Sequence, residues 1–217
     1  ESLAKQSRKP SGWLGKNILQ PMFVKGNAHL NQFILELMAV QANEQVLEVG
    51  FGPGDLLFHL CRQAPLAQFT GLDFSPLMLQ QASLHTQSFI QSGQLTLIEG
   101  SSDNMPLDDS FFHQVTCANT LYFWQPPEPH FKEILRVLKP GGRFVMGFRT
   151  GEQIDSMQLH PTIFARYTVE EVGSLLELAG FESIQIESRA GFPVDSVCVV
   201  AYKPTYKSIA ASVRTIR

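Results

Sequence analysis

The sequence is poor in cysteine, in excess basic charge and in long apolar runs, and each shortage excludes a class of protein. Its three cysteines are odd in number and have no metal-type spacing, so we expect reduced thiols and no metal. The net charge of −3 shows no excess of basic residues of the kind that binds nucleic acid. No apolar run reaches the length of about 18 residues that a membrane span needs. With no secretory segment visible, these shortages predict a cytoplasmic protein.

The length and apolar content set the scale of the fold. A chain of 217 residues with 44% hydrophobic residues can form one α/β domain with a full core, and is too short for two comfortable domains. We expect an N-terminal arm and helix over residues 1–41, a main domain over 42–203 and a tail over 204–217. Within the main domain, residues 149–167 have no periodicity, which is typical of a functional loop.

A glycine-rich stretch from Val46 to Asp55 is the feature that organises the domain. A short apolar run containing Glu48 leads into Gly50, Gly52 and Gly54, a pattern that predicts a buried strand, a tight turn and a helix. Without Cβ atoms, this backbone can take positive φ or approach a ligand closely. The turn is therefore predicted to form the floor of a binding site.

The spacing of the glycines distinguishes two kinds of nucleotide site. The dinucleotide pattern Gly-x-Gly-x-x-Gly, begun at Gly50, places Asp55 where the third small residue belongs. Begun at Gly52, it places Leu57 there. An acid at the start of the helix suits the helix dipole but would repel a pyrophosphate. The spacing of the glycines therefore disfavours a nicotinamide oxidoreductase, which we keep as an alternative.

The pattern Glu48-x-Gly50-x-Gly52-x-Gly54 resembles motif I of the class I S-adenosylmethionine (SAM) methyltransferases. The run 138–145, with its Pro-Gly-Gly turn, is similar to the segment of that family that leads into the fifth strand. The resemblance implies S-adenosyl-L-methionine as the cofactor, whose sulfonium and ammonium suit an acidic rim. It also implies a Rossmann-like α/β fold: a mostly parallel seven-stranded sheet with a C-terminal antiparallel hairpin and helices on both faces.

Asp73 is the candidate for binding the ribose. It ends a second short strand, over residues 69–73, near the spacing of about 20 residues at which a carboxylate can reach back to a ribose. Its alternative role is to cap the next helix, which Ser75 and Pro76 are expected to start. The following Phe74 is included in the predicted cofactor site.

The loop over residues 100–107 resembles that of the ubiquinone/menaquinone-type methyltransferases, with one departure. The resemblance implies an acid that accepts from the adenine amino group, and Ser101 occupies its position. Either Asp103 reaches the amino group by another path, or Ser101 and the Ser102 backbone make a weaker neutral bond. His113, where the family has aspartate, is expected to be a surface or structural residue.

The end of the fourth strand is predicted to face the methyl group, because ligands in open parallel sheets lie outside the carboxyl ends of strands. Asn119 can bond the amino or carboxyl end of SAM. The following aromatic residues can face the sulfonium or simply pack in the core. The complete set of expected cofactor-binding residues is Glu48, Gly50, Phe51, Gly52, Gly54, Asp73, Phe74, Ser102, Asp103, Asn119 and Asn27.

An amphipathic helix over residues 27–40 is expected either to cover the cofactor pocket or only to pack on the sheet. The resemblance places a substrate lid in the 149–167 loop. Helical spacing after the capping box at Thr168 predicts a helix that stops at Gly180. The residues expected to bind the substrate are Phe23, Tyr122, Phe123, Trp124 and Phe164.

The function implied by the resemblance is transfer of a methyl group from SAM to a small acceptor by in-line displacement. The many aromatic residues favour an apolar or aromatic acceptor. Such a displacement depends on positioning more than on acid–base help, so no catalytic dyad is required. If a hydroxyl is methylated, His160 and Tyr122 are the candidates for a base. A non-catalytic SAM-binding or partner-binding module would share the same motifs and is the second alternative.

Overall fold

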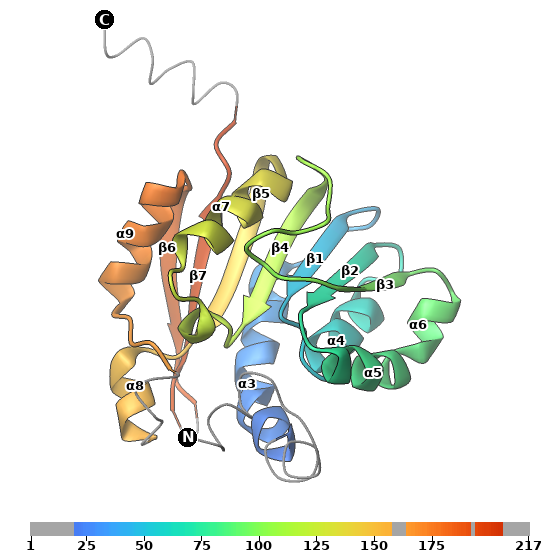
Figure 1. Cartoon of the computed structure of the whole chain (residues 1–217), viewed down its shortest axis with the longest axis horizontal. Helices are drawn as coiled ribbons and strands as arrows, with labels where there is room; N and C mark the ends of the chain where they lie inside the picture. The colour runs from blue at the N-terminus through green and yellow to red at the C-terminus, as the bar shows by residue number, and fades with distance from the viewer. Residues whose placement is uncertain (1–19, 158–163, 192–193, 206–217) are drawn as a thin grey trace, which may run out of the picture.

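A computed structural model describes residues 20–157, 164–191 and 194–205. It contains one seven-stranded sheet in the order β3-β2-β1-β4-β5-β7-β6 (Figure 1). The strands are β1 (Gln45–Val49), β2 (Gln68–Asp73), β3 (Leu95–Glu99), β4 (Phe112–Ala118), β5 (Leu138–Phe148), β6 (Glu182–Arg189) and β7 (Ser196–Tyr202).

The pairing of the strands determines where a ligand can bind. Strands β3, β2, β1, β4 and β5 are all parallel, and β7 joins β5 and β6 in antiparallel fashion. After β1 the chain builds outward through β2 and β3, then returns to the opposite side of β1 as β4. Such a switch point leaves a crevice at the carboxyl ends of the two strands. The predicted sheet, with its C-terminal hairpin, is confirmed.

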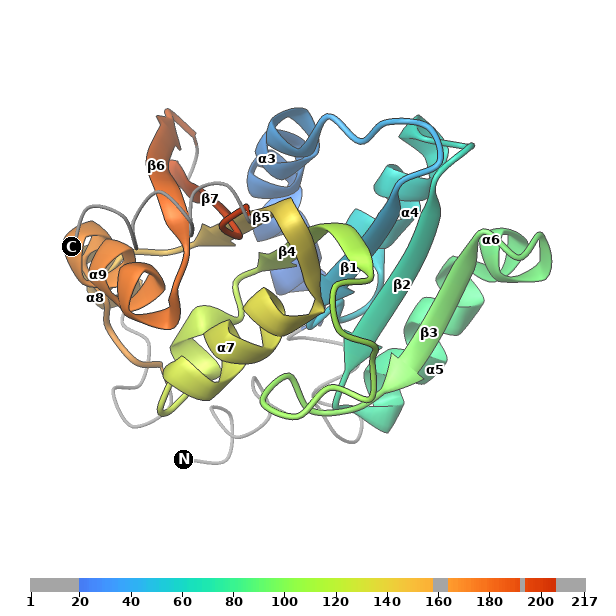
Figure 2. The ribbon, with the colours of Figure 1, turned by 90° about the horizontal axis from the view of Figure 1, so that it is seen from above.

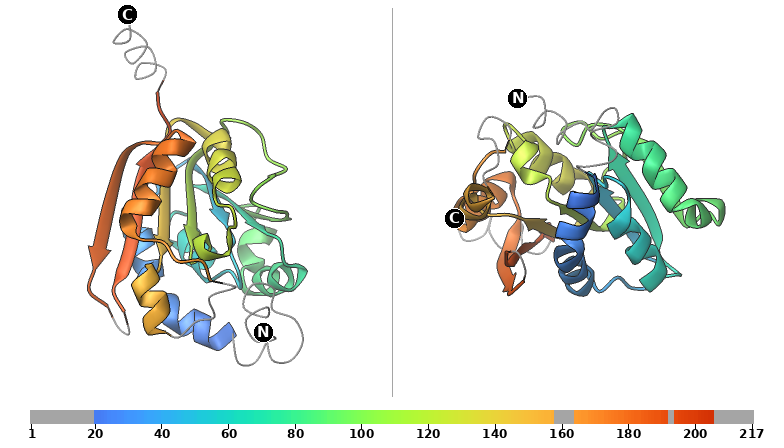
Figure 3. Two further views of the ribbon diagram at one scale, coloured as in Figure 1. Left: turned by 60° about the vertical axis from the view of Figure 1, so that its left-hand side comes forward. Right: turned by 90° about the horizontal axis from the view of Figure 1, so that it is seen from below.

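Helices cover both faces of this sheet (Figure 2). Helices α7 and α9 pack against one apolar cluster of sheet residues, and α3, α4 and α5 pack against a second cluster on the other face. Figure 3 shows α9 beside the β6–β7 hairpin. The helices are α3 (Gln20–Met38), α4 (Asp55–Gln63), α5 (Pro76–His85), α6 (Gln87–Gln91), the 3₁₀ turn η2 (Leu121–Phe123), α7 (Glu128–Val137), α8 (Gly151–Ser156) and α9 (Val169–Ala179).

Local sequence explains where several helices begin and end. Ser75 caps α5, its side chain accepting from the Met78 N–H at 3.5 Å, and Thr168 forms a reciprocal capping box with Glu171 at the start of α9. Gly180 ends α9 in the left-handed conformation, with φ of 104°. These three predictions are confirmed. Caps are predictable because they depend on residues only a few positions apart in the sequence.

Helix α3 packs tightly on β5 because of a glycine in the strand. A Cβ atom at Gly147 would lie 2.7 Å from Ile34 Cδ1 and 2.8 Å from Leu30 Cδ1. Both of these α3 side chains are buried. The amphipathic helix was predicted to begin at Asn27, whereas α3 begins at Gln20. Packing against the sheet therefore accounts for the apolar stripe of α3 in its C-terminal part.

Two local features differ from the sequence-based expectation. The loop after β5 contains α8, which begins with a capping box between Thr150 and Gln153. Strand β5 begins at Leu138, so the expected Pro-Gly-Gly turn lies inside it, where Gly141 has φ of 77° and the pairing with β4 shifts register. No helix in the described part of the chain has both the length and the apolar character needed to cross a membrane.

Candidate cofactor and active site

The glycine turn connects β1 to α4 and exposes its backbone to the crevice. Gly50, Gly52 and Gly54 all have positive φ, at 73°, 54° and 91°. A Cβ atom at Gly50 would overlap the Thr120 methyl group, whereas one at Gly52 would find no atom of the described residues within 4 Å. The space beside Gly52 is therefore open, and any side chain placed there would fill it.

Asp73 holds this turn in place from the end of β2. Its Oδ2 accepts from the Gly52 N–H at 2.9 Å, and its Oδ1 accepts from the Ser75 N–H at 2.9 Å. Burial raises the pKa of the Asp73 carboxyl, opposed by these backbone donors. Asp73 thus organises both the glycine turn and the start of α5. Each oxygen keeps a further lone pair, so the predicted bond to a ribose is still available.

Glu48 is an acid inside the sheet, 2% exposed. It is paired in register with Thr116 of β4, and neither Glu48 Oε2 nor Thr116 Oγ1 has a hydrogen-bond partner among the described residues. Burial first, and then the negative charges of Asp55 and Asp73, raise the pKa of Glu48 well above its usual value. A nearby positive charge would stabilise the ionised carboxylate of Glu48, and a sulfonium or ammonium group carries such a charge.

The raised pKa of Glu48 predicts a pH-dependent stability. The folded protein holds a proton that the unfolded chain loses near pH 4.5. The contribution of the protonated Glu48 to the free energy of unfolding is therefore complete below that pH, and it is lost as the pH rises through the higher pKa of the folded protein. We expect Glu48→Gln to flatten the fall in the free energy of unfolding that wild type shows as the pH rises above 4.5, as measured by urea denaturation.

Glu99→Gln, at an exposed position at the end of β3, is the matched control and should keep the wild-type slope. Equal slopes in wild type and Glu48→Gln would contradict the linkage.

The end of β4 brings the N-terminal helix to the site. Asn119 has φ of 56° and its Nδ2 donates to Asn27 Oδ1 on α3 at 2.8 Å, although the two residues are 92 positions apart. Asn119 Oδ1 and the neighbouring Thr120 Oγ1 are buried and have no hydrogen-bond partner within the described ranges. Unpaired buried acceptors are unfavourable, so an incoming ammonium donor would suit both atoms.

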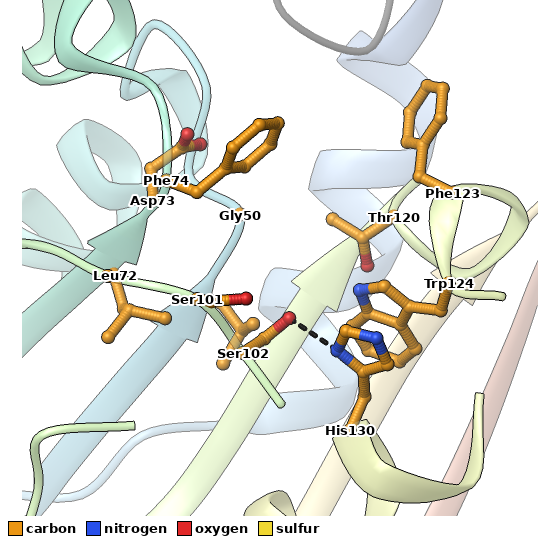
Figure 4. Close-up of a pocket in the computed structure, with 12 residues that line it drawn as sticks. Gly50, Leu72, Asp73, Phe74, Ser101, Ser102, Thr120, Phe123, Trp124 and His130 are labelled. Atoms are coloured by element: carbon orange, nitrogen blue, oxygen red, sulfur yellow. Dashed lines mark hydrogen bonds between the residues drawn. The ribbon is translucent and has the colours of Figure 1, made fainter. Parts of the chain in front are cut away.

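A pocket of about 550 Å³, its open mouth included, lies at this edge of the sheet (Figure 4). Figure 4 shows Asp73 and Phe74 on one side, Thr120, Phe123 and Trp124 on the other, and the two serines between them. The pocket is lined by Val49, Gly50, Leu72, Asp73, Phe74, Gly100, Ser101, Ser102, Thr120, Phe123, Trp124 and His130.

The residues present fit SAM. Bare glycine backbone, a carboxylate at the ribose position and unpaired acceptors near the switch point match a cofactor that carries a sugar and two cationic groups and no phosphate. Phe51 is buried beneath the turn and Asp103 is exposed outside the pocket. The binding role of each predicted residue stays a prediction.

The residues predicted to bind the substrate are partly brought together. Tyr122, Phe123 and Phe164 are in mutual ring contact, with centroids 4.8 to 5.4 Å apart, and Ile154 of α8 packs with them. Trp124 points into the pocket instead (Figure 4). The backbone of Phe23 lies in α3, but its side chain, like all of His160, is outside the described residues.

Thr120 and His130 line the pocket with polar side chains that the sequence analysis did not single out. Thr120 directly follows Asn119, and its contact with the glycine turn could have been suspected from that position alone. His130 stands at the start of α7 with no motif around it, and only the fold brings it to the pocket. By contrast, His113 is structural as predicted: its Nδ1 accepts from the Gln45 N–H at 2.8 Å, and its Nε2 faces Lys139 Nζ.

Other chemistries find little support in the part of the chain that the structure describes. It contains no cluster of three or more potential metal ligands. All three cysteines are free and buried, and burial raises the pKa of the Cys117 thiol to about 12, so this residue is not an activated nucleophile. The sheet order, the glycine turn and the Asp73 carboxylate bonded to that turn are features of a nucleotide-type cofactor site in a Rossmann-like fold.

Comparison with known proteins extends this conclusion. Residues 47–146 match the family model described as "Methyltransferase domain". The uncharacterized methyltransferase YdaC of Bacillus subtilis is 30% identical over 178 residues, which cover 82% of this chain and 93% of YdaC. The chain belongs to the class I SAM-dependent methyltransferases, with S-adenosyl-L-methionine as the family's cofactor.

Two further similarities are more limited. The ubiquinone/menaquinone biosynthesis C-methyltransferase UbiE of Pseudomonas fluorescens is 31% identical, but the match covers only 53% of this chain and 45% of UbiE. A methyltransferase solved in complex with the Haloferax volcanii Trm112 methyltransferase activator superimposes with a TM-score of 0.78, covering 94% of this chain and 98% of that one. Its 20% identity shows the fold alone.

Proposed function

We propose that this chain methylates a small acceptor that presents an apolar or aromatic surface. The observation that carries the proposal is the aromatic cluster of Tyr122, Phe123 and Phe164. Phe123 both belongs to this cluster and lines the cofactor pocket, so the buried rings of Tyr122 and Phe164 hold in place an aromatic ring that an acceptor can contact. Aromatic faces suit a flat acceptor and a neighbouring sulfonium alike.

The residues of the chain would act by positioning. SAM supplies a methyl group on a sulfonium, which is electrophilic without acid catalysis. Asp73 would hold the ribose, while Asn119 and Thr120 would accept from the amino group with the acceptor atoms that are unpaired in the structure. Burial raises the pKa of the Tyr122 hydroxyl, so Tyr122 stays protonated at neutral pH, and its predicted role as a base is disfavoured.

The acceptor class is tested by measuring S-adenosylhomocysteine (SAH) release with a panel of polar, aliphatic and aromatic metabolites. We expect turnover with aromatic or apolar members. Phe123→Ala should raise the KM for such an acceptor about tenfold, because it removes a large apolar contact. Phe111→Ala truncates a phenylalanine that is 42% exposed, immediately before β4 and outside the pocket lining, and serves as the matched control.

Exclusive turnover of polar acceptors would refute the proposed substrate class. If SAH binds but no acceptor supports turnover, the non-catalytic module becomes the better description. Repeating the panel with a purified Trm112-type protein tests for a protein partner of the kind present in the Haloferax volcanii complex. The nicotinamide alternative is opposed by the acids around the turn, and titration with NADH should show no change in its fluorescence.

A further inference from the structure

We propose that Ser102 and His130 form the polar element that recognises the adenine of SAM in this chain, His130 acting as a positioning residue for the Ser102 hydroxyl. The inference rests on the proposed use of SAM and goes beyond it by assigning the nucleobase end of the pocket. Neither the loop motif nor the comparisons identify His130, which the fold brings from the start of α7.

The distribution of polar groups in the pocket favours this end for the base. Besides Asp73 at the ribose position and Thr120 near the switch point, the polar side chains of the lining are Ser101, Ser102 and His130. The rest of this region is apolar or aromatic, with Leu72 and Phe74 on one side and Trp124 on the other (Figure 4). A flat slot with one polar rim fits a purine, which has apolar faces and a polar edge.

His130 is held on two sides. Its Nδ1 lies 2.7 Å from Ser102 Oγ, and its ring stacks on Trp124 with centroids 4.7 Å apart and an angle of 6° between the planes. Trp124 itself is 5% exposed and packs edge-on against Phe131 of the core. The core therefore fixes Trp124, Trp124 orients His130, and His130 fixes the direction of the Ser102 hydroxyl.

Hydrogen-bond arithmetic allows Ser102 to accept from an adenine amino group. A serine hydroxyl has one donor and two accepting lone pairs. If His130 Nδ1–H donates to Oγ, one lone pair is left; if the hydroxyl donates to Nδ1, both are left. Asp103, the other candidate for this contact, is exposed and accepts a hydrogen bond from Ser101. In either tautomer Ser102 Oγ keeps an accepting lone pair, and its direction is set by His130, whereas Ser101, which also lines the pocket, is bonded to the exposed Asp103.

The test measures the affinity for SAH and for its deamino analogue, whose purine carries hydrogen in place of the 6-amino group, by calorimetry. We expect wild type to prefer SAH by roughly five- to tenfold, the range of one neutral hydrogen bond. Ser102→Ala and His130→Phe should each reduce that ratio towards unity while leaving affinity for the deamino analogue within about twofold. His130→Phe keeps a flat ring against Trp124 and removes both ring nitrogens, including the Nδ1 that bonds Ser102.

Two further variants separate recognition from packing. His130→Asn places a hydrogen-bonding atom near the Nδ1 position without the stacked ring, and should retain the preference for SAH. The double variant Ser102→Ala/His130→Phe should lose no more than either single variant, because both residues act through one bond. Ser92→Ala, at an exposed serine that bonds the Phe89 carbonyl, is the matched control.

An unchanged ratio in Ser102→Ala and His130→Phe, or an equal loss of affinity for both ligands, would overturn this inference and leave the proposed function intact. Failure of wild type to bind SAH at all would overturn the proposed function and this inference with it. A lower melting temperature with an unchanged ratio would show that the pair is merely structural, and would also overturn it.

Discussion

Gly52→Val is expected to abolish SAH binding, a loss of at least about 100-fold in affinity, while the chain still folds. No described atom lies within 4 Å of the position that a Cβ would take at Gly52, so the new side chain meets none of the described residues. Because Gly52 bonds Asp73, which lines the pocket, we expect this side chain to occupy the floor of the cofactor site. The Gly52 N–H that bonds Asp73 is kept. The measurement is calorimetry with SAH, together with the thermal shift that SAH produces.

The structure offers a close control for this variant. Gly93, between α6 and β3, also has positive φ, at 76°, and a Cβ there would also find no described atom within 4 Å. Gly93 precedes β3, so it lies at the opposite edge of the sheet from the carboxyl ends of the parallel strands. Gly93→Val should carry a similar backbone strain of about 1 to 3 kcal/mol and bind SAH normally. If both variants lose binding equally, strain and not occlusion is responsible, and the glycine turn is not the cofactor floor.

The fold could be predicted from the sequence because its decisive features are local. The run from Glu48 to Gly54 specifies strand, turn and helix within a few residues. Ser75, Thr168 and Gly180 mark helix ends by short-range hydrogen bonds or by backbone conformation. Together with the resemblance of the glycine turn and of the run into β5, these positions were enough to predict a mostly parallel seven-stranded sheet with a C-terminal antiparallel hairpin; the order of the strands came from the structure.

The missed parts of the site depend on contacts between distant residues. The pairing of Asn27 with Asn119 spans 92 positions, and the contact of Ser102 with His130 spans 28. Neither partner carries a motif that identifies the other. Helix α8 was missed for a different reason: its six residues are too few to show a periodicity, although the capping box at Thr150 was present in the sequence.

The division of the chain into an arm, a main domain and a lid remains a prediction from the sequence. The structure adds that α3 is not an isolated cap: it packs on β5 and β7 and brings Asn27 to the end of β4. Covering the pocket and packing on the sheet, treated as alternatives from sequence, are therefore compatible. Gly147 makes this possible, since a larger residue there would push α3 outward.

Removing the carboxylate of Asp73 is expected to have the second large effect, on both binding and stability. Asp73→Ala deletes the acceptor of two backbone donors, Gly52 N–H and Ser75 N–H, and leaves them buried without that partner. Each such loss destabilises a protein by about 1 to 3 kcal/mol. Affinity for SAH should fall about 100-fold, because charge-assisted bonds to the ribose disappear with the turn's anchor.

A ligand change separates these two causes. The analogue of SAH without the 2′ and 3′ hydroxyl groups cannot bond a carboxylate, so wild type should bind it far more weakly than SAH. Asp73→Asn keeps one acceptor oxygen, so it should recover part of the stability and little of the preference for SAH. Asp195→Asn is the matched control: it alters an exposed carboxylate that accepts from the Gly191 N–H, and it should change neither the stability nor the preference. If Asp73→Ala loses stability but still discriminates between the two ligands as wild type does, then Asp73 only supports the turn, and the ribose is bound elsewhere.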